Sequence, residues 1–269
     1  MPRFSVATWN INSVRLRQDL VGQLMQDHAP DVVCLQETKC LDANFPGGAF
    51  RKLGYEHQAI NGQKGYHGVA ILSKLPIADI DPRGFCGKGD ARHIGVTVAT
   101  PLGAVRVDNF YVPAGGDIPD PAVNDKFQHK LDFLAEMTAW IGGAAAPVPS
   151  IVVGDLNVAP LPEDVWSHKQ LLDVVSHTPV ETEALEAIRI GGGWLDVLRH
   201  HVPVPERLYT WWSYRSKDWR AANKGRRLDH IWASGHFAGR LAQLSILSEA
   251  RDWERPSDHV PVIATFADS

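Results

Sequence analysis

Polar side chains that can bind a metal ion or move a proton stand at the ends of several apolar segments, where packing does not require them. They are Asn10, Asn12, Glu37, Asp155, Asn157, Asp229, Asp258 and His259. Residues i and i+2 of an extended segment share a face, so Asn10 and Asn12 present a pair of amides to one side. Asp155 and Asn157 form a second pair by the same spacing. Strand ends are rigid positions on which to build a site.

This set of donors predicts a site for a hard divalent cation. Carboxylates and amides with a single imidazole and no thiolate suit Mg²⁺, with Mn²⁺ as a substitute, better than zinc. A metal helps phosphate ester hydrolysis, because acid–base catalysis supplies roughly 3–5 kcal/mol while enzymes remove roughly 8–23 kcal/mol of barrier. A cation on the phosphate adds positioning and charge stabilisation. Taken singly, each residue is more consistent with an Asx turn or a solvated loop, but the whole set favours a site.

A second group of residues, between Arg207 and Arg227, indicates contact with nucleic acid. Seven cations stand against only Asp218 there, a local charge of +6 in a chain whose formal net charge is −4. Four rings lie among them: Trp211, Trp212, Tyr214 and Trp219. Cations neutralise phosphates and flat rings stack on bases, so the combination is typical of a DNA-binding surface. The alternative is that the tryptophans belong to the core and the charges to a solvated face.

Composition places the chain among ordinary globular proteins. Its 269 residues are 44% hydrophobic and 22% charged, enough to bury a core in one large domain or two small ones. The three cysteines are odd in number and lack CxxC spacing, which argues against a secreted disulfide scaffold and a zinc site. Glycines and prolines interrupt the longest uncharged stretch, Met137 to Gly154, and the N-terminus lacks a signal peptide. We therefore expect a cytoplasmic protein without membrane contact.

The candidate residues need strands to position them, and the sequence predicts eight. They are Phe4–Trp9, Val32–Leu35, Val69–Ser73, Ile94–Ala99, Val105–Val112, Ser150–Val153, Leu228–Ala233 and Val260–Phe266, most of them rich in β-branched residues. Apolar residues at helical spacing predict helices at Ser13 to Asp27 and Val123 to Ile141, the second capped by Asn124 or a neighbour. Gly, Pro and Asp predict loops at Asn44–Gly48, Arg83–Asp90, Pro113–Pro121 and Pro160–Pro162. Periodicity alone predicts one α/β or α+β domain.

Six motifs follow one another along the chain. They are TWNINS at Thr8–Ser13, LQETK at Leu35–Lys39, NFYVP at Asn109–Pro113, GDLN at Gly154–Asn157, RLDHIWAS at Arg227–Ser234 and SDHVPV at Ser257–Val262. By these motifs the chain resembles, from Phe4 to Phe266, the exonuclease III family of abasic-site endonucleases within the endonuclease/exonuclease/phosphatase superfamily. The resemblance implies an α/β fold, a four-layered α/β sandwich of two packed mixed sheets flanked by helices. It also implies a single domain over residues 1–269.

The resemblance implies roles for residues of the motifs. Metal binding is implied for Glu37 as the main carboxylate, together with Asn10, Asp258, Asp155 and Asn157. Catalytic roles are implied for Tyr111, Asp155, Asn157, Asp229 and His259. In relatives the residue matching Asp155 activates or orients the attacking water, and the imidazole matching His259, held by an aspartate, contacts the scissile phosphate. Whether Asp155 or His259 is the base, and whether one or two metal ions act, stays open.

The same resemblance implies DNA contacts. They are assigned to Trp211, Trp212, Arg215, Lys217, Arg226, Leu228, Arg92 and Lys64. The implied reaction is Mg²⁺-dependent cleavage on the 5′ side of an abasic site to leave a 3′-hydroxyl, with removal of 3′-blocking groups and 3′→5′ digestion of duplex DNA. The implied partner is double-stranded DNA with abasic sites or blocked 3′ ends, and we expect the protein to act as a monomer.

Three departures from the family pattern leave alternatives open. Arg226 stands where relatives often have an apolar residue, Ala114 replaces an amide, and the segment from Pro160 to Gly193 differs. These features keep open a 3′-end-processing enzyme without abasic-site incision. A superfamily phosphatase acting on a non-nucleic-acid phosphoester and a non-catalytic DNA-binding module are further alternatives. The cationic, tryptophan-rich segment argues against the phosphatase on a non-nucleic-acid substrate. The filled catalytic positions argue against the non-catalytic binding module.

Overall fold

Two six-stranded sheets form the centre of the computed structural model, which describes residues 1–268. The first sheet contains β1 Arg3–Asn10, β2 Val32–Gln36, β3 His57–Asn61, β4 Val69–Ser73, β13 Leu241–Ile246 and β14 Val262–Ala267. The second contains β5 Ile77–Asp81, β6 His93–Thr100, β7 Gly103–Tyr111, β8 Ser150–Asp155, β9 Leu195–Asp196 and β12 Asp229–Ala233. Their orders are β13-β14-β1-β2-β4-β3 and β5-β6-β7-β8-β12-β9. Each sheet is mixed, because β1 with β2 and β7 with β8 are parallel neighbours.

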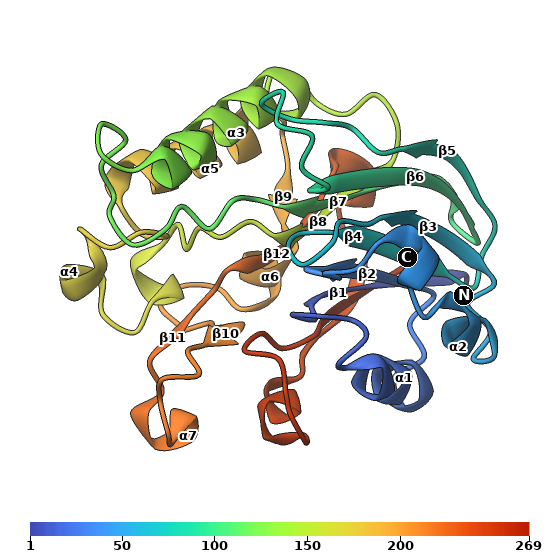
Figure 1. Cartoon of the computed structure of the whole chain (residues 1–269). Helices are drawn as coiled ribbons and strands as arrows, with labels where there is room; N and C mark the ends of the chain where they lie inside the picture. The colour runs from blue at the N-terminus through green and yellow to red at the C-terminus, as the bar shows by residue number, and fades with distance from the viewer. Residues whose placement is uncertain (269) are drawn as a thin grey trace.

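The helices are α1 Gln18–Asp27, α2 Gly47–Arg51, α3 Asp125–Ile141, α4 His168–Leu171, α5 Pro179–Gly191, α6 Val197–His201 and α7 Trp219–Ala222. Four of them, α1, α2, α3 and α5, cover the outer faces of the two sheets (Figure 1). Figure 1 shows α3 and α5 above the second sheet and α1 and α2 below the first. A separate two-stranded ribbon, β10 Trp211–Trp212 with β11 Gly225–Arg226, lies near α7. The four layers confirm the predicted α/β sandwich.

The alternation of side chains along the strands builds two different cores. Val6 of β1 points between the sheets and packs in one cluster with Val107 of β7. Its neighbour Ala7 points the other way and packs with Leu24 of α1. Successive strand residues face opposite sides of a sheet, and both faces of these central strands are buried. This is why the sequence shows them as continuous apolar runs with no polar alternation.

The structure confirms the eight predicted strands, with ends that differ by no more than two residues. The first predicted helix starts too early, because α1 begins at Gln18 and not at Ser13. Ser13 has a φ of 88°, and its amide donates to the carbonyl oxygen of Glu37, so this segment is tied to the loop after β2. The second helix begins at Asp125, and the side chain of Asn124 caps it as expected by accepting from the amide of Lys126.

Other elements were missed or misplaced by the sequence analysis. The loop predicted at Asn44–Gly48 is partly wrong, since a 3₁₀ turn covers Asp42–Asn44 and α2 begins at Gly47. Pro162 likewise starts a 3₁₀ turn, whereas the loops at Arg83–Asp90 and Pro113–Pro121 are confirmed. Helix α5 and several short or edge strands were not predicted: β3, β5, β9, β10, β11 and β13. Edge strands are exposed on one side and carry polar residues, so their apolar signal is weak. No helix within residues 1–268 is long and apolar enough to cross a membrane.

A buried ion network holds the start of β12 against neighbouring segments. The guanidinium of Arg227 donates to both carboxylate oxygens of Asp164, each at 2.8 Å, and to Asp196 at 2.7 Å. Arg199 also pairs with Asp164. The paired carboxylates raise the pKa of Arg227 although burial acts against its charge, so the group stays a cation. The network joins the 3₁₀ turn that contains Asp164 and the start of α6 to the start of β12.

We expect Arg227→Met to destabilise the fold by about 3–5 kcal/mol, because it leaves two carboxylates buried without their main partner. The free energy of unfolding from urea titration measures the effect. The matched control is Arg189→Met, which breaks a more exposed pair with Glu186 on α5 and should change stability by only about 0–1 kcal/mol. Equal, small losses in both variants would contradict a structural role for Arg227.

Candidate active site

Five strand ends bring predicted catalytic side chains to one edge of the sandwich. β1 ends at Asn10, Glu37 follows β2, β7 ends at Tyr111, β8 ends at Asp155 and β12 begins at Asp229. The sheet register pairs Asp155 with Tyr111 on one side and with Asp229 on the other. The loop before β14 approaches the same edge and supplies the remaining groups. The predicted residues therefore come from distant parts of the chain and meet at strand ends.

Left-handed backbone turns the chain sharply where these strands end. Asn12, Glu37 and Asn157 have φ values of 47°, 52° and 53°. Residues other than glycine adopt this conformation rarely, and at functional sites the surrounding contacts sustain the strain. Gly154 has a φ of 141°, and a Cβ there would lie 1.9 Å from the carbonyl oxygen of Phe110. The GDLN motif thus needs glycine at its first position.

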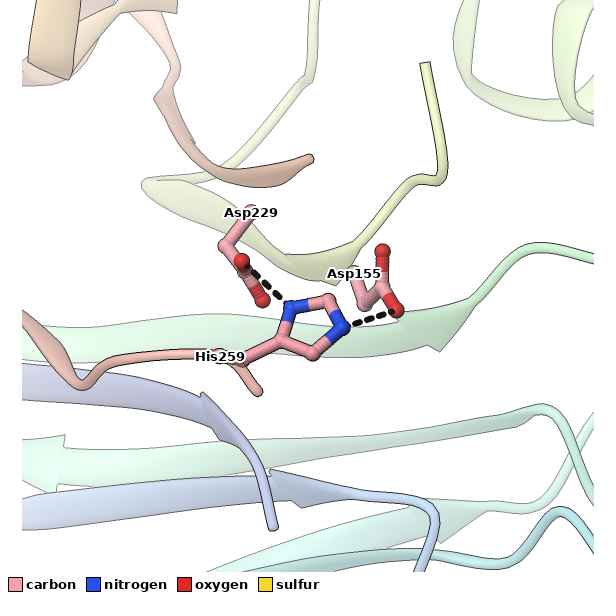
Figure 2. Close-up of side chains that lie close together, drawn as sticks. All are labelled: Asp155, Asp229 and His259. Atoms are coloured by element: carbon pink, nitrogen blue, oxygen red, sulfur yellow. Dashed lines mark hydrogen bonds and ion pairs between the residues drawn. The ribbon is translucent and has the colours of Figure 1, made fainter. Parts of the chain in front are cut away.

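An imidazole lies between two buried carboxylates at the centre of the site (Figure 2). His259 Nδ1 lies 2.8 Å from Asp229 Oδ2, and His259 Nε2 lies 3.6 Å from Asp155 Oδ2. All three side chains are almost completely buried. Asp229 Oδ2 also accepts a hydrogen bond of 2.6 Å from the hydroxyl of Thr210. The aspartate therefore orients the ring, while Nε2 faces Asp155 across a gap wider than a hydrogen bond.

The charges in this cluster shift one another's protonation. Burial alone would lower the pKa of His259, but the carboxylates of Asp229 and Asp155 outweigh it and raise that pKa to about 10. Burial also raises the pKa of Asp155, and the positive charge of His259 offsets only part of this effect. At neutral pH the ring is a cation with a proton on each nitrogen. The raised pKa of Asp155 suits a group that takes up a proton.

A second network surrounds Glu37. Its Oε1 accepts hydrogen bonds from Asn10 Nδ2 at 2.9 Å and from the hydroxyl of Tyr111 at 2.8 Å. Asn10 Nδ2 also donates to Asp155 Oδ2 at 2.8 Å, which links Glu37 to the imidazole cluster. Burial would raise the pKa of Glu37, but Lys39 and these hydrogen bonds outweigh it and lower that pKa. Burial and the Glu37 carboxylate raise the pKa of Tyr111 well above its usual value, so the phenol keeps its proton.

The oxygens around Glu37 fit a hard divalent cation. Lys39 Nζ lies 2.7 Å from Glu37 Oε2 and 2.6 Å from Asn12 Oδ1, so a cationic group of the protein already sits against them. Asp155, Asp229 and His259 also bring ligand atoms within 4.8 Å of one another. An imidazolium that directs both N–H groups at carboxylates has no lone pair for a metal. We therefore place the candidate cation site at Glu37 and not on His259.

Asp258 lies beside this network without a direct contact to Glu37. Its Oδ2 accepts from Trp211 Nε1 at 3.0 Å and its Oδ1 from Asn12 Nδ2 at 3.2 Å. An antiparallel β-bridge between Trp211 and His259 holds strand β10 against the loop before β14, which carries Asp258 and His259. The predicted metal ligand Asp258 is thus linked to Glu37 through Asn12 and Lys39.

Asn157 is held by its backbone as well as by its amide. Its N–H donates to Asp155 Oδ1 at 3.0 Å, and its Nδ2 donates to the carbonyl oxygen of Val112 at 2.8 Å. The fully buried Lys130 of α3 donates to the Asn157 carbonyl oxygen at 2.7 Å and pairs with Glu181 of α5. The two outer helices therefore help to hold the loop after β8.

The predicted DNA-binding residues divide into exposed and buried groups. Arg215, Lys217 and Lys64 are exposed. Trp211 and Arg226 are half-buried beside the catalytic cluster. Arg92, Trp212 and Leu228 are buried. Trp212 is only 5% exposed and packs against Tyr209 and Trp219, and Arg92 lies over the ring of Tyr111.

The local charge of +6 overstates the cations available at the surface. Arg227 is fully buried and neutralised by Asp164 and Asp196. Arg220 is exposed but pairs with Asp252, which lies far along the sequence. A count along the sequence could not include these distant partners. The cationic surface is therefore smaller than the sequence indicates.

Sequence reasoning missed three residues that support the cluster. Thr210 accepts from the amides of Leu228 and Asp229 while its hydroxyl donates to Asp229. Ser257 donates to the Asn10 carbonyl oxygen at 2.7 Å and joins the loop before β14 to the end of β1. Lys39 contacts Glu37 as described above. Ser257 and Lys39 stand inside quoted motifs, and Thr210 lies in the cationic segment between Arg207 and Arg227, so their position was a signal. Most of their partners, however, are remote in sequence.

We expect Asp229→Asn to lower the pKa of His259 from about 10 towards about 6.5, because the substitution removes the anion that most stabilises the imidazolium. NMR titration of the ring, assigned with a His259→Gln spectrum, measures this change. Asp252→Asn is the control, because it removes an equal charge from an exposed aspartate that pairs with Arg220. This variant should leave the pKa of His259 unchanged. An unchanged His259 pKa in Asp229→Asn would rule out the proposed pairing.

Comparison with known proteins places this geometry in a family. Residues 7–259 match the model of the endonuclease/exonuclease/phosphatase family. Exodeoxyribonuclease III of Haemophilus influenzae is 32% identical over 96% of this chain and 98% of its own length.

Solved structures agree with this assignment. An AP endonuclease from Archaeoglobus fulgidus superposes with a TM-score of 0.89 at 33% identity, covering 98% of this chain and 100% of that one. The 3′ phosphatase NExo from Neisseria, bound to a product DNA hairpin, gives 0.88 at 31% identity with the same coverage. The chain therefore belongs to the endonuclease/exonuclease/phosphatase family, and within it to the exonuclease III type of phosphodiester hydrolases.

Proposed function

We propose that this protein is a Mg²⁺-dependent DNA-repair phosphodiesterase. It cleaves on the 5′ side of abasic sites to leave a 3′-hydroxyl, removes 3′-blocking groups and digests duplex DNA in the 3′→5′ direction. One domain over residues 1–269 carries these activities, as a monomer acting on cellular DNA in the cytoplasm. The observation that carries the proposal is the buried Asp229–His259–Asp155 cluster, linked through Asn10 to Glu37.

The chain's own residues account for the proton and charge movements of hydrolysis. Asp155 takes a proton from the attacking water, which its raised pKa and its position opposite Nε2 favour. His259, a cation oriented by Asp229, donates from Nε2 to the scissile phosphate and stabilises its growing negative charge. Asn157, held by its hydrogen bonds, stabilises the same charge. Tyr111 keeps its proton and, in this proposal, donates a hydrogen bond to the leaving 3′ oxygen.

A divalent cation completes the proposed site. Glu37 is the main ligand, with Asn10 and Asp258 beside it and Asp155 and Asn157 at its edge. The oxygen donors, and the contact of the Lys39 ammonium group with Glu37, support binding of Mg²⁺, for which Mn²⁺ substitutes. When bound, the cation neutralises charge on the phosphate and lowers the barrier to attack.

Double-stranded DNA is the proposed partner. Arg215, Lys217 and Lys64 are exposed cations that suit contacts with the phosphate backbone, and such contacts position a duplex without reading its sequence. Trp211 is half-buried and lies next to His259, so it suits a nucleotide turned out of the helix. Trp212, Leu228 and Arg92 act from below this surface as supports, since they are buried.

One observation favours a second candidate, 3′-end processing without abasic-site incision. Arg226 Nη1 donates to the carbonyl oxygen of Val175 and to the hydroxyl of Ser176, so this cation closes part of the wall beside Trp211. A relative of the same fold, NExo from Neisseria, is named as a 3′ phosphatase. Substrates with and without an internal abasic site separate the two candidates.

We expect Asp155→Ala to slow cleavage of an abasic-site duplex by about 10²–10⁴-fold, the range for loss of a general base. Duplex affinity should remain close to that of the parent protein, because Asp155 carries no phosphate contact in the proposal. Single-turnover cleavage and fluorescence anisotropy measure the two effects. Asp27→Ala, at the exposed end of α1, is the control for an acidic residue outside the site. Full turnover by Asp155→Ala would remove this residue from the mechanism.

We expect Glu37→Gln to raise the Mg²⁺ concentration needed for half-maximal cleavage by at least about tenfold, because the site loses its main anionic ligand. Calorimetric titration of Mg²⁺ into the DNA-free protein gives a second readout, in which the variant should show weaker binding. Removal of the metal with a chelator should stop the parent enzyme. Identical Mg²⁺ titrations for both proteins would exclude Glu37 as a ligand.

A further inference from the structure

A cavity of about 510 Å³ opens beside the catalytic cluster. Its lining includes Trp166, Trp211, Arg215, Lys224, Arg226 and Asp117. Trp211 connects this cavity to the reaction centre, because it bridges to His259 through the backbone and donates from Nε1 to Asp258. A fragment released from the scissile phosphate would therefore lie within reach of the cavity.

The lining is cationic and its cations are free to meet an anion. Arg215, Lys224 and Arg226 face a single carboxylate, that of the exposed Asp117. None of the three cations forms an ion pair with a carboxylate in the chain from residue 1 to 268. The carboxylate of Glu181 acts on the pKa of Arg226, but this carboxylate is already paired with Lys130.

Aromatic rings hold two of these cations in place. Lys224 Nζ lies 4.5 Å from the ring centroid of Trp166, and the guanidinium carbon of Arg226 lies 5.4 Å from that of Trp211. Contacts of this kind position a positive charge without neutralising it. The cavity thus combines flat apolar walls with uncompensated positive charge.

Arg226 is the most firmly held of the three cations. Its Nη1 donates to the Val175 carbonyl oxygen at 3.0 Å and to the Ser176 hydroxyl at 2.8 Å. Its Nε is buried and has no hydrogen-bond partner among the residues that the structure describes. A guanidinium offers five donors, and in Arg226 only Nη1 forms hydrogen bonds with the residues that the structure describes. A charged acceptor in the cavity would supply the counter-ion that Arg226 lacks, whereas a neutral sugar would not.

We infer that Arg226 makes the enzyme select DNA 3′ ends whose released fragment carries a negative charge beyond the scissile phosphate. This inference rests on the proposed function. In the reaction the water oxygen bonds to phosphorus, the bond from phosphorus to the DNA 3′ oxygen breaks, and that oxygen takes up a proton. The fragment leaves as a phosphomonoester. A carboxylate on the fragment, as in a 3′-phosphoglycolate end, then meets the free donors of Arg226.

Two duplexes that differ only in the blocked 3′ end test this selection. One ends in 3′-phosphoglycolate and the other in a 3′-(2-hydroxyethyl) phosphate, which has a neutral hydroxymethyl group in place of the carboxylate. We expect the parent protein to show kcat/KM about tenfold higher for the anionic end, equivalent to about 1.4 kcal/mol. Arg226→Met should bring the ratio of the two values close to one, and Arg226→Lys should keep part of the preference.

The ratio serves as the readout because both rates come from the same preparation, so a partly misfolded variant does not distort it. Arg240→Met removes an equal charge at an exposed site paired with Asp268 and should retain the parent ratio. A parent ratio near one, or the same ratio in Arg226→Met, overturns the inference while the proposed function stands. A parent protein that cleaves neither end and leaves an abasic duplex intact overturns the proposed function together with the inference.

Discussion

Two carboxylates that lie directly opposite each other on neighbouring strands share one imidazole, and the active-site edge is organised around this arrangement. Asp155 and Asp229 are register partners on β8 and β12, a pairing of like charges that destabilises a sheet by itself. The imidazolium of His259 lies between them and compensates the repulsion. Because all three groups are buried, removing the imidazolium leaves two like charges facing each other in a low-dielectric site. The imidazolium of His259 thus offsets the repulsion between the two strands and also faces the carboxylate of Asp155.

Hydrogen bonds from both sheets extend this cluster to the candidate metal site. Asn10 at the end of β1 donates to Asp155 in one direction and to Glu37 in the other, so this amide joins the ends of the two sheets. Between the sheets, Gln36 donates to Asn109, which in turn donates to backbone oxygens of β2 and β4. Polar residues buried in this way fix the relative position of the strand ends. The helices on the outside contribute through Lys130, which holds the loop after β8.

The clustering of the candidate site residues could be predicted from the sequence because these residues are local features of strand ends. Asn10, Glu37, Asp155 and His259 stand in short motifs, and the apolar runs before them mark the strands that bring them together. The partners of charged residues could not be predicted in this way. Arg227 reads as a surface cation until Asp164 and Asp196 are seen beside it, and Trp212 reads as a stacking platform until Tyr209 and Trp219 cover it. The start of α1 was misplaced because remote backbone contacts near Glu37 override the helical spacing at Ser13.

The most direct test of the account is cleavage of two labelled duplexes, one with an internal abasic-site analogue and one with a 3′-phosphate, each with Mg²⁺ and with a chelator. The account predicts Mg²⁺-dependent incision on the 5′ side of the abasic site and Mg²⁺-dependent removal of the 3′-phosphate. Removal of the 3′-phosphate without incision would limit the enzyme to 3′-end processing. Absence of reaction on both duplexes with Mg²⁺ present would contradict the assignment of this site to DNA phosphoester hydrolysis.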